Sequence, residues 1–140
     1  MIRNALINDL PTLLSISHRS FETPWSSASF EAELRKSFSK TYLFLDKDQP
    51  VGYLIIWVLG AEGEIVSLAV DPGWRNRGIA KKLLDHAFGE FKPVKKWSLE
   101  VNPLNNNAIS LYKKYKFERQ RMIKNYYGQG QDAIYMVKNN

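Results

Sequence analysis

The sequence contains no cysteine among its 140 residues. This absence excludes disulfide bonds, thiolate metal sites and a cysteine nucleophile, and it suits a reducing compartment. Histidine is almost as scarce. The two histidines, His18 and His86, lie in predicted helices without a partner motif. We therefore expect neither of them to have a chemical role, and we expect the chain to hold no metal.

The chain also lacks a long apolar run. The longest nearly unbroken one covers residues 51–61, and it is too short to span a bilayer as a helix, which needs about 20 residues. Polar residues interrupt the N-terminal segment at Arg3, Asn4 and Asp9, a pattern that differs from a secretion signal. Without an internal repeat, low-complexity tract or linker, residues 1–140 are expected to form one soluble, cytoplasmic domain that does not contact a membrane.

Positive charge is concentrated in one part of the sequence. The formal net charge is +6, and residues 72–124 hold 13 Lys/Arg but only 4 Asp/Glu. The remaining residues together carry more negative than positive charge. A basic region of this kind attracts polyanions, so the charge pattern is compatible both with a phosphate-bearing cofactor and with nucleic acid.

Residues 65–84 are the stretch around which the rest of the chain is organised. Their pattern predicts a strand, a turn and a helix, in that order. The apolar, β-branched run at 65–70 is typical of a strand buried on both faces. Asp-Pro-Gly at 71–73 predicts a turn, in which Gly73 is expected to take a positive φ. From Ile79 onwards, apolar residues recur at i+4 steps as far as residue 91, which predicts an amphipathic helix.

A loop that leads directly into a helix N-terminus is a natural anion site. The first backbone N–H groups of the helix have no partner within it, and the helix dipole adds positive charge there. Gly78 has no Cβ, so a phosphate can approach the backbone closely. Four cations surround this glycine in the sequence: Arg75, Arg77, Lys81 and Lys82.

The rest of the chain alternates between strand and helix patterns. Three helices are expected besides the one after Gly78. Their candidate N-caps are Asp9, then Ser26 or Ser27, and then one of the asparagines from Asn105. Strands are expected over residues 1–5, 42–45, 51–59, 65–70, 97–102, 117–127 and 133–138. The resulting order, β-α-α-β-β-β-α-β-α-β-β, predicts a mixed α/β sheet.

Four groups of residues give this order a family resemblance. They are Pro24-Trp25; Leu68-Ala69-Val70-Asp71-Pro72 with the loop Arg75-Asn76-Arg77-Gly78-Ile79-Ala80; Leu99-Glu100-Val101 with Asn105 and Leu111-Tyr112; and Asn125-Tyr126-Tyr127 with Asp132-Ala133-Ile134. The loop resembles the R/Q-x-x-G-x-G/A pyrophosphate loop of the GNAT (Gcn5-related) N-acetyltransferases. Within that superfamily, the set is similar to the bacterial ribosomal-protein alanine N-acetyltransferases (RimI-type). Two positions depart from the pattern: Ala80 replaces the final glycine, and Asn102 stands where arginine is common.

The resemblance implies the GNAT fold and direct transfer of an acetyl group from acetyl-CoA to an amine, here the N-terminal alanine of a ribosomal protein. Glu100 is the candidate base, because it lies on the polar face of an alternating strand. It would take the ammonium proton directly or through a water. By resemblance, Tyr112 is the acid that protonates the sulfur of coenzyme A.

The resemblance also implies binding residues. Those for the cofactor are Leu68, Ala69, Val70, Arg75, Asn76, Arg77, Gly78, Ile79, Ala80, Lys81, Asn105 and Tyr112. We expect the two strands to part at Val70 and Glu100, so that pantetheine pairs with the first three residues like an added strand and the Val70 N–H faces the thioester oxygen. Asn105 would hold the cofactor's amide arm, and it also suits a helix cap. Trp25, Tyr126 and Tyr127 would line a peptide groove, although plain hairpin or core packing explains them as well.

The sequence leaves three functions open. An N-terminal α-amine, with a pKa of about 7.7–8.0, is easier for one carboxylate to deprotonate than a lysine, with a pKa of about 10.4, which favours a protein N-terminus. A free small-molecule amine would use the same chemistry. A nucleic-acid-binding module based on the basic region is the alternative of a different class. We expect a monomer or weak dimer that does not require nucleic acid.

Overall fold

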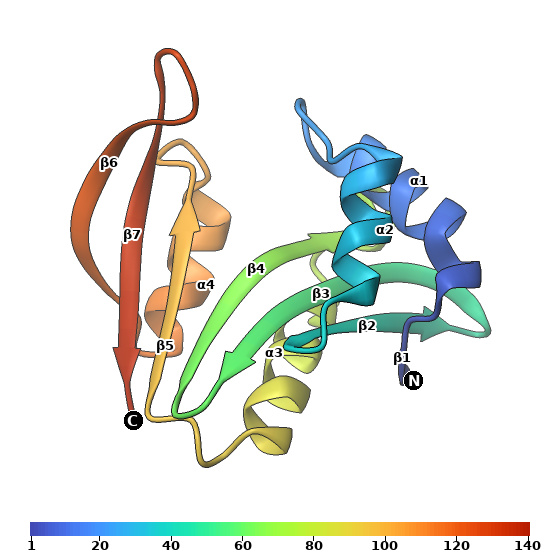
Figure 1. Cartoon of the computed structure of the whole chain (residues 1–140). Helices are drawn as coiled ribbons and strands as arrows, with labels where there is room; N and C mark the ends of the chain where they lie inside the picture. Colours follow the sequence, from blue (N-terminus) through green and yellow to red (C-terminus); the bar gives the residue numbers. More distant parts are fainter.

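Seven strands form one mixed sheet in the computed structural model, which describes all 140 residues. The spatial order is β1-β2-β3-β4-β5-β7-β6, and only the neighbours β4 and β5 are parallel (Figure 1). In chain order, the strands are β1 (Ile2–Asn4), β2 (Ser39–Asp46), β3 (Gln49–Leu59), β4 (Glu62–Val70), β5 (Lys96–Val101), β6 (Glu118–Gly128) and β7 (Gln131–Asn139).

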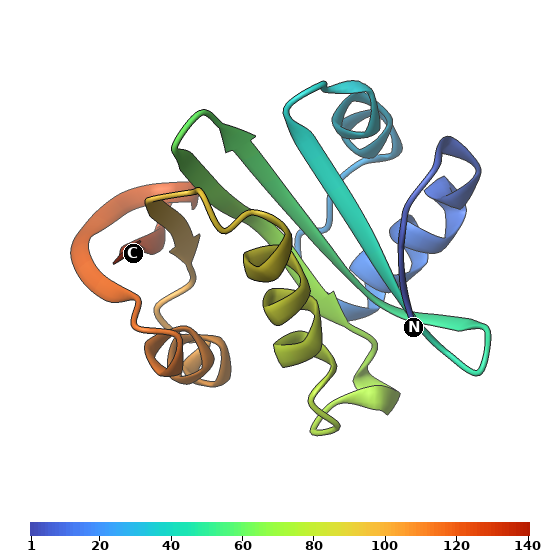
Figure 2. The ribbon, with the colours of Figure 1, turned by 90° about the horizontal axis from the view of Figure 1, so that it is seen from below.

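Four helices cover the two faces of the sheet (Figures 1 and 2). They are α1 (Leu10–Ser20), α2 (Ser27–Arg35), α3 (Ile79–Glu90) and α4 (Asn106–Lys114), with short 3-10 helices at Ile7–Asp9 and Pro72–Trp74. None of the helices has both the length and the apolar character needed to cross a membrane. The predicted order of strands and helices is confirmed.

Buried apolar side chains form two clusters, one on each side of the sheet. The larger cluster joins the sheet to α3 and α4, and the smaller one lies under α1 and α2. The predicted apolar stripe of α3 is confirmed, because Ile79, Leu83 and Ala87 are buried. The central strand β4 contributes to both clusters, with Ile65 in the larger and Ala69 in the smaller.

The alternation predicted for β5 is confirmed as well. Trp97, Leu99 and Val101 are buried, whereas Glu100 is only partly covered. Trp97 packs on Gly63 of β4 so closely that a Cβ at this glycine would lie 2.6 Å from the indole ring. This close approach holds the beginnings of β4 and β5 together.

Two predicted caps are confirmed, at α2 and α4. The Ser26 hydroxyl accepts a hydrogen bond from the Ser29 N–H at 3.1 Å, and the Asn105 side chain accepts one from the Ala108 N–H at 3.1 Å. Each bond satisfies one of the free N–H groups at the start of its helix. Both helices therefore begin where the sequence predicts.

Two local expectations are wrong. Asp9 occupies the N-cap position of α1 without capping it, because its carboxylate accepts from the Leu6 N–H at 2.7 Å and pairs with Arg3 at 2.9 Å. Gly73 does not take a positive φ, since the turn after β4 winds into a 3-10 helix. The left-handed glycine of this connection is Gly78, with φ of 75°.

Candidate active site

Strands β4 and β5 separate halfway along their length. Their parallel pairing ends at the pair Ile65↔Leu99. On its other side, β4 has a β-bulge, because the register with β3 leaves Val66 without a partner. Figure 1 shows the ribbons of β4 and β5 side by side at one end and apart at the other. The parting begins at Val66, earlier on β4 than the predicted position at Val70.

The separation leaves polar backbone groups of β4 without a strand partner on the β5 side. The Asp71 N–H donates to the Val51 carbonyl of β3 at 2.7 Å. Because successive residues of a strand point their N–H and C=O groups to opposite sides, those of Val70 and Leu68 face the gap. The groups of Ala69 face β3. Of the three residues expected to pair with pantetheine, Leu68 and Val70 are therefore the two with suitable backbone orientation.

The loop after β4 exposes the start of α3. Gly78 is the N-cap, no side chain bonds to the first N–H groups of the helix, and a Cβ at this position would meet no atom within 4 Å. Residues 75–78 are exposed, and Asn76 also has a positive φ of 64°. Ile79 is buried in the larger cluster, so it offers only its backbone to a ligand. These features fit a phosphate group.

The cations of this loop differ in their availability. Lys81 is paired with Asp85 at 3.0 Å, one turn further along α3. Arg75 donates through Nε to the Val70 carbonyl at 3.1 Å, which leaves the rest of its guanidinium exposed. Arg77 is also exposed. Arg75 and Arg77 are thus the positive charges of the loop that are best placed to meet an anion.

Helix α4 carries two further predicted residues. Asn105 uses its carbonyl oxygen to cap α4, which leaves both N–H donors of its amide for another partner. Tyr112 is buried against Phe117, with ring centroids 5.7 Å apart. Burial and the neighbouring Tyr127 raise the pKa of Tyr112. Its hydroxyl therefore stays protonated at neutral pH, as a proton donor requires.

A cleft of about 520 Å³ opens on the α2 side of the sheet. Its lining includes Trp25, Glu33, Lys36, Trp57, Glu64, Val66, Glu100, Tyr126 and Tyr127. The predicted base Glu100 and the three aromatic residues predicted to bind substrate thus line one cleft. In Figure 1, the α1–α2 loop and the tip of the β6–β7 hairpin stand at the same end of the molecule, on either side of the opening between β4 and β5.

The hairpin tip owes its shape to the motif that surrounds the two tyrosines. Asn125 has a positive φ of 57°, its N–H donates to Asp132 at 3.0 Å, and its side-chain oxygen accepts from the Gly130 N–H at 2.7 Å. The pairing of β6 with β7 is interrupted over this segment. Tyr126 and Tyr127 therefore leave the regular ladder and stack edge-to-face, with centroids 4.8 Å apart.

Two carboxyl groups face each other inside the cleft. Glu64 of β4 and Glu100 of β5 lie on either side of the point where the strands stop pairing. Burial and the nearby Glu100 raise the pKa of Glu64 to about 7. Burial and the same carboxylate raise the pKa of Tyr126 to about 12. The cleft is therefore a negatively charged, partly desolvated space.

A third carboxylate, Glu33, has its charge already compensated. It is only 3% exposed and accepts hydrogen bonds from the Trp57 indole N–H and from Lys36, the latter at 3.1 Å. The Lys36 ammonium also lies 4.8 Å from the centre of the Trp57 ring. All three residues of this group line the cleft.

Sequence reasoning missed Glu33, Trp57 and Glu64. A signal existed for Glu64, because a carboxylate inside an apolar strand has to face a polar space. Glu33 follows Phe30 at i+3, which places it on the buried side of α2. Trp57 gave no signal beyond an apolar strand position.

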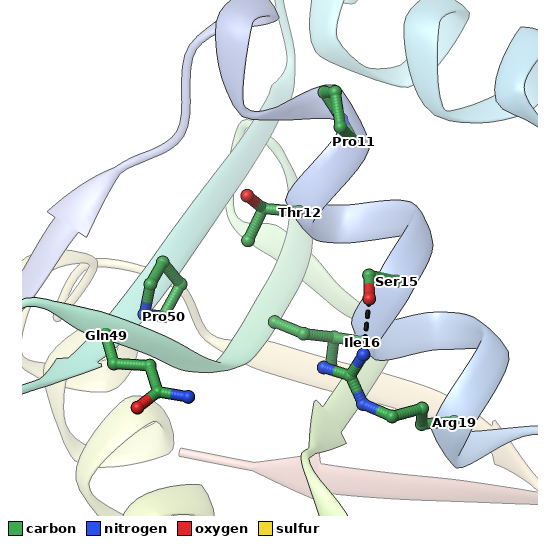
Figure 3. Close-up of a pocket in the computed structure, with 7 residues that line it drawn as sticks. All are labelled: Pro11, Thr12, Ser15, Ile16, Arg19, Gln49 and Pro50. Carbon is green, nitrogen blue, oxygen red and sulfur yellow. Dashed lines mark hydrogen bonds between the residues drawn. The ribbon is translucent and has the colours of Figure 1, made fainter.

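A second, shallower pocket of about 340 Å³ lies beside α1 (Figure 3). It is lined by Pro11, Thr12, Ser15, Ile16, Arg19, Gln49 and Pro50. Its one charged group, Arg19, already binds Ser15 and the Asp71 carboxylate. None of the predicted site residues lines it, so the candidate site is the cleft around Glu100 together with the gap and the loop beside it.

Comparisons with known proteins match this chain to a protein family and to solved structures of the same fold. The profile of the acetyltransferase (GNAT) family matches residues 10–117. The [ribosomal protein bS18]-alanine N-acetyltransferase of Salmonella typhimurium is 33% identical over 135 residues, which cover 92% of this chain and 90% of that protein. The crystal structure of the Escherichia coli ribosomal-protein-S18-alanine N-acetyltransferase has a TM-score of 0.91 at 27% identity and covers 99% of this chain and 92% of its own. Arabidopsis thaliana NAA60 in complex with acetyl-CoA has a TM-score of 0.89 and covers 99% of this chain and 97% of its own, but at 23% identity this likeness bears on the fold alone.

Proposed function

The chain belongs to the acetyltransferase (GNAT) family, and from this premise we propose that it acetylates the α-amine of a protein N-terminus, with the N-terminal alanine of a ribosomal protein as the expected acceptor. Its activity is that of an N-acetyltransferase. The relatives from Salmonella and Escherichia coli are named for this reaction on protein S18. The observation that carries the proposal is the cleft, in which Glu100 meets three aromatic side chains.

Acetyl-CoA would supply the acetyl group as a thioester. The residues present fit such a ligand, since an uncapped helix start stands beside open space at Gly78. The N–H groups from Asn76 to Lys81, with Arg75 and Arg77, would hold the diphosphate. The backbone of Leu68 and Val70 would hold the pantetheine chain, and the Asn105 amide would bind its carbonyl groups.

Two observations support the assignment of acid and base: Glu100 lines the cleft, and the Tyr112 hydroxyl has a raised pKa and stays protonated. Glu100 would remove the proton from the incoming ammonium. Without such a base, only about a tenth of an α-amine is neutral at pH 7. The Val70 N–H would donate to the thioester oxygen as negative charge develops there. Tyr112 would give its proton to the departing sulfur.

The shape of the cleft favours a peptide over a small amine. Tyr126 and Tyr127 are 46% and 42% exposed, which is high for large aromatic side chains. They lie where the regular pairing of β6 with β7 is interrupted. Trp25 faces the same space from the α1–α2 loop. An extended chain passing between them would cover this aromatic surface.

A panel of acceptors tests the proposal. Release of free coenzyme A from acetyl-CoA is measured with short peptides that begin in alanine, with the same peptides blocked at the N-terminus, and with polyamines. We expect turnover only with the free N-terminal alanine. Turnover with polyamines alone would make the protein a small-molecule acetyltransferase, and thermal stabilisation by an oligonucleotide but not by acetyl-CoA would overturn the enzyme assignment.

A further inference from the structure

The cleft contains two facing carboxylates, whereas the mechanism above uses only one. We infer that Glu64 is a functional partner of Glu100, and that the two together hold the substrate's ammonium group between them and take up its protons. This inference rests on the proposed function and deepens it, because it gives Glu64 a role in binding and deprotonating the acceptor's ammonium group.

The register of the sheet imposes the pair. Ile65 and Leu99 are the last paired residues of β4 and β5, and both side chains are buried in the larger cluster. The residue before Ile65 and the residue after Leu99 must then point to the opposite side of the sheet. Those residues are Glu64 and Glu100, and both line the cleft.

Both carboxyl groups line the cleft, and Glu100 is close enough to Glu64 to raise the pKa of its carboxyl. Two neighbouring carboxylates repel each other, and a proton shared between them relieves the repulsion. In the free protein the pair therefore keeps one proton near neutral pH, in line with the raised pKa of Glu64. A cation placed between the carboxylates would replace that proton.

No cation of the protein is available to do this. On α2, Lys36 is bound to Glu33 and stacked over Trp57. On β6, the groups that face the pair are the tyrosines Tyr126 and Tyr127, which stay neutral at physiological pH. The pair therefore has no positively charged partner within the protein, and a ligand would have to supply one. A primary ammonium fits, because it is small and its three N–H donors can reach oxygens on both sides.

The second carboxylate also suits the proton count of the reaction. Conversion of an ammonium into an amide removes two protons from the nitrogen: one before it attacks the thioester carbon, and one as the C–N bond forms and the C–S bond breaks. The departing sulfur gains one proton, from Tyr112, which is reprotonated in turn, so one proton leaves to solvent overall. Two adjoining carboxylates can accept both protons in succession, whereas one carboxylate would have to release the first before it took the second.

The free protein provides a test that needs no substrate. With ¹³C-labelled glutamate, the Glu64 carboxyl should titrate near pH 7, in keeping with its raised pKa of about 7, and its midpoint should fall when Glu100 is replaced in Glu100→Gln. A Glu64 midpoint that stays the same in this variant would overturn the pairing, because burial alone would then explain the raised value.

Kinetics with the Glu64→Gln variant test the role in substrate binding and proton transfer. Glutamine mimics the protonated carboxyl, so kcat/KM for an alanine-starting peptide should match wild type at pH 6 and fall by about tenfold at pH 8, with KM for acetyl-CoA unchanged. Glu62→Gln, on the exposed start of the same strand, is the matched control and should match wild type throughout. A loss that is equal at all pH values, or no loss, would contradict the inference. A wild type that acetylates no amine would instead refute the proposed function, and the titration alone would then decide on the pair.

Discussion

The two sides of the β4–β5 gap are built in different ways. On the α3 side, the loop from Arg75 to Lys81 presents backbone N–H groups around the left-handed Gly78. On the α2 side, the cleft is formed by side chains from α2, β3, β4, β5 and β6. The first site depends on local backbone geometry and suits a ligand shared by a whole family. The second depends on tertiary convergence, which is where a choice of acceptor can be made.

The largest effect that separates the two sides is expected from the base. Glu100→Gln should lower turnover by roughly 10²–10⁴-fold, the range for a lost general base, while the affinity for acetyl-CoA stays at the wild-type value. Steady-state rates and calorimetric binding measure the two quantities. Glu62→Gln is the control, and wild-type turnover in Glu100→Gln would remove Glu100 from the mechanism.

A substitution in the loop after β4 should weaken the binding of acetyl-CoA and leave the peptide site unchanged. Gly78→Ala puts a Cβ on a residue with φ of 75°, which costs about 1–2 kcal/mol of strain and narrows the approach of a phosphate. KM for acetyl-CoA should rise, because the Cβ occupies space that the phosphate would use, with KM for the peptide unchanged. Gly73→Ala is the matched control, because Gly73 has no positive φ and a Cβ there meets no atom within 4 Å. Equal effects of the two alanines would argue against the loop as the phosphate site.

A smaller effect is expected at the hairpin tip. Asp132→Ala removes the acceptor of the Asn125 N–H, so Tyr126 and Tyr127 should lose their fixed position. We expect KM for the peptide to rise several-fold while KM for acetyl-CoA does not change. Gln131→Ala, an exposed neighbour, serves as the control. An unchanged peptide KM in Asp132→Ala would mean that the tyrosines do not contact the acceptor.

The smallest effect concerns stability. Because folding raises the pKa of Glu64 from 4.5 to about 7, the folded state prefers the protonated carboxyl, and its stability falls as pH rises through this interval. Glu64→Gln should therefore melt at the wild-type temperature near pH 4 and at a slightly higher temperature at pH 8. A lower melting temperature at pH 8 would show that the ionised Glu64 makes a stabilising contact instead.

The same contrast decides what the sequence could predict. The strand–loop–helix unit with Gly78 was predictable because its determinants are neighbours in sequence: an apolar run, a glycine and an i+4 stripe. The alternation that turns Glu100 out of the core was equally local. The predictions for Asp9 and Gly73 were wrong because a different local structure formed. The Asp9 carboxylate pairs with Arg3, and the turn that contains Gly73 winds into a 3-10 helix.

The cleft was only partly predictable. Glu33, Trp57 and Glu64 come together because Trp57 is paired with Glu64 across β3 and β4 and because α2 packs over that pair. This convergence depends on register and helix packing, which no short stretch of sequence encodes. The aromatic residues Trp25, Tyr126 and Tyr127 were identified through a family resemblance, and their contact with an acceptor stays a prediction.

The central claim is that one gap joins a cofactor site on one side of the sheet to a peptide site on the other. A conjugate of coenzyme A with an alanine-starting peptide, linked through an acetyl carbon to the α-nitrogen, tests this most directly by calorimetry. It should bind at least about 10²-fold more tightly than coenzyme A or the peptide alone, because linkage makes the second contact intramolecular. A conjugate that binds no more tightly than coenzyme A would contradict the account.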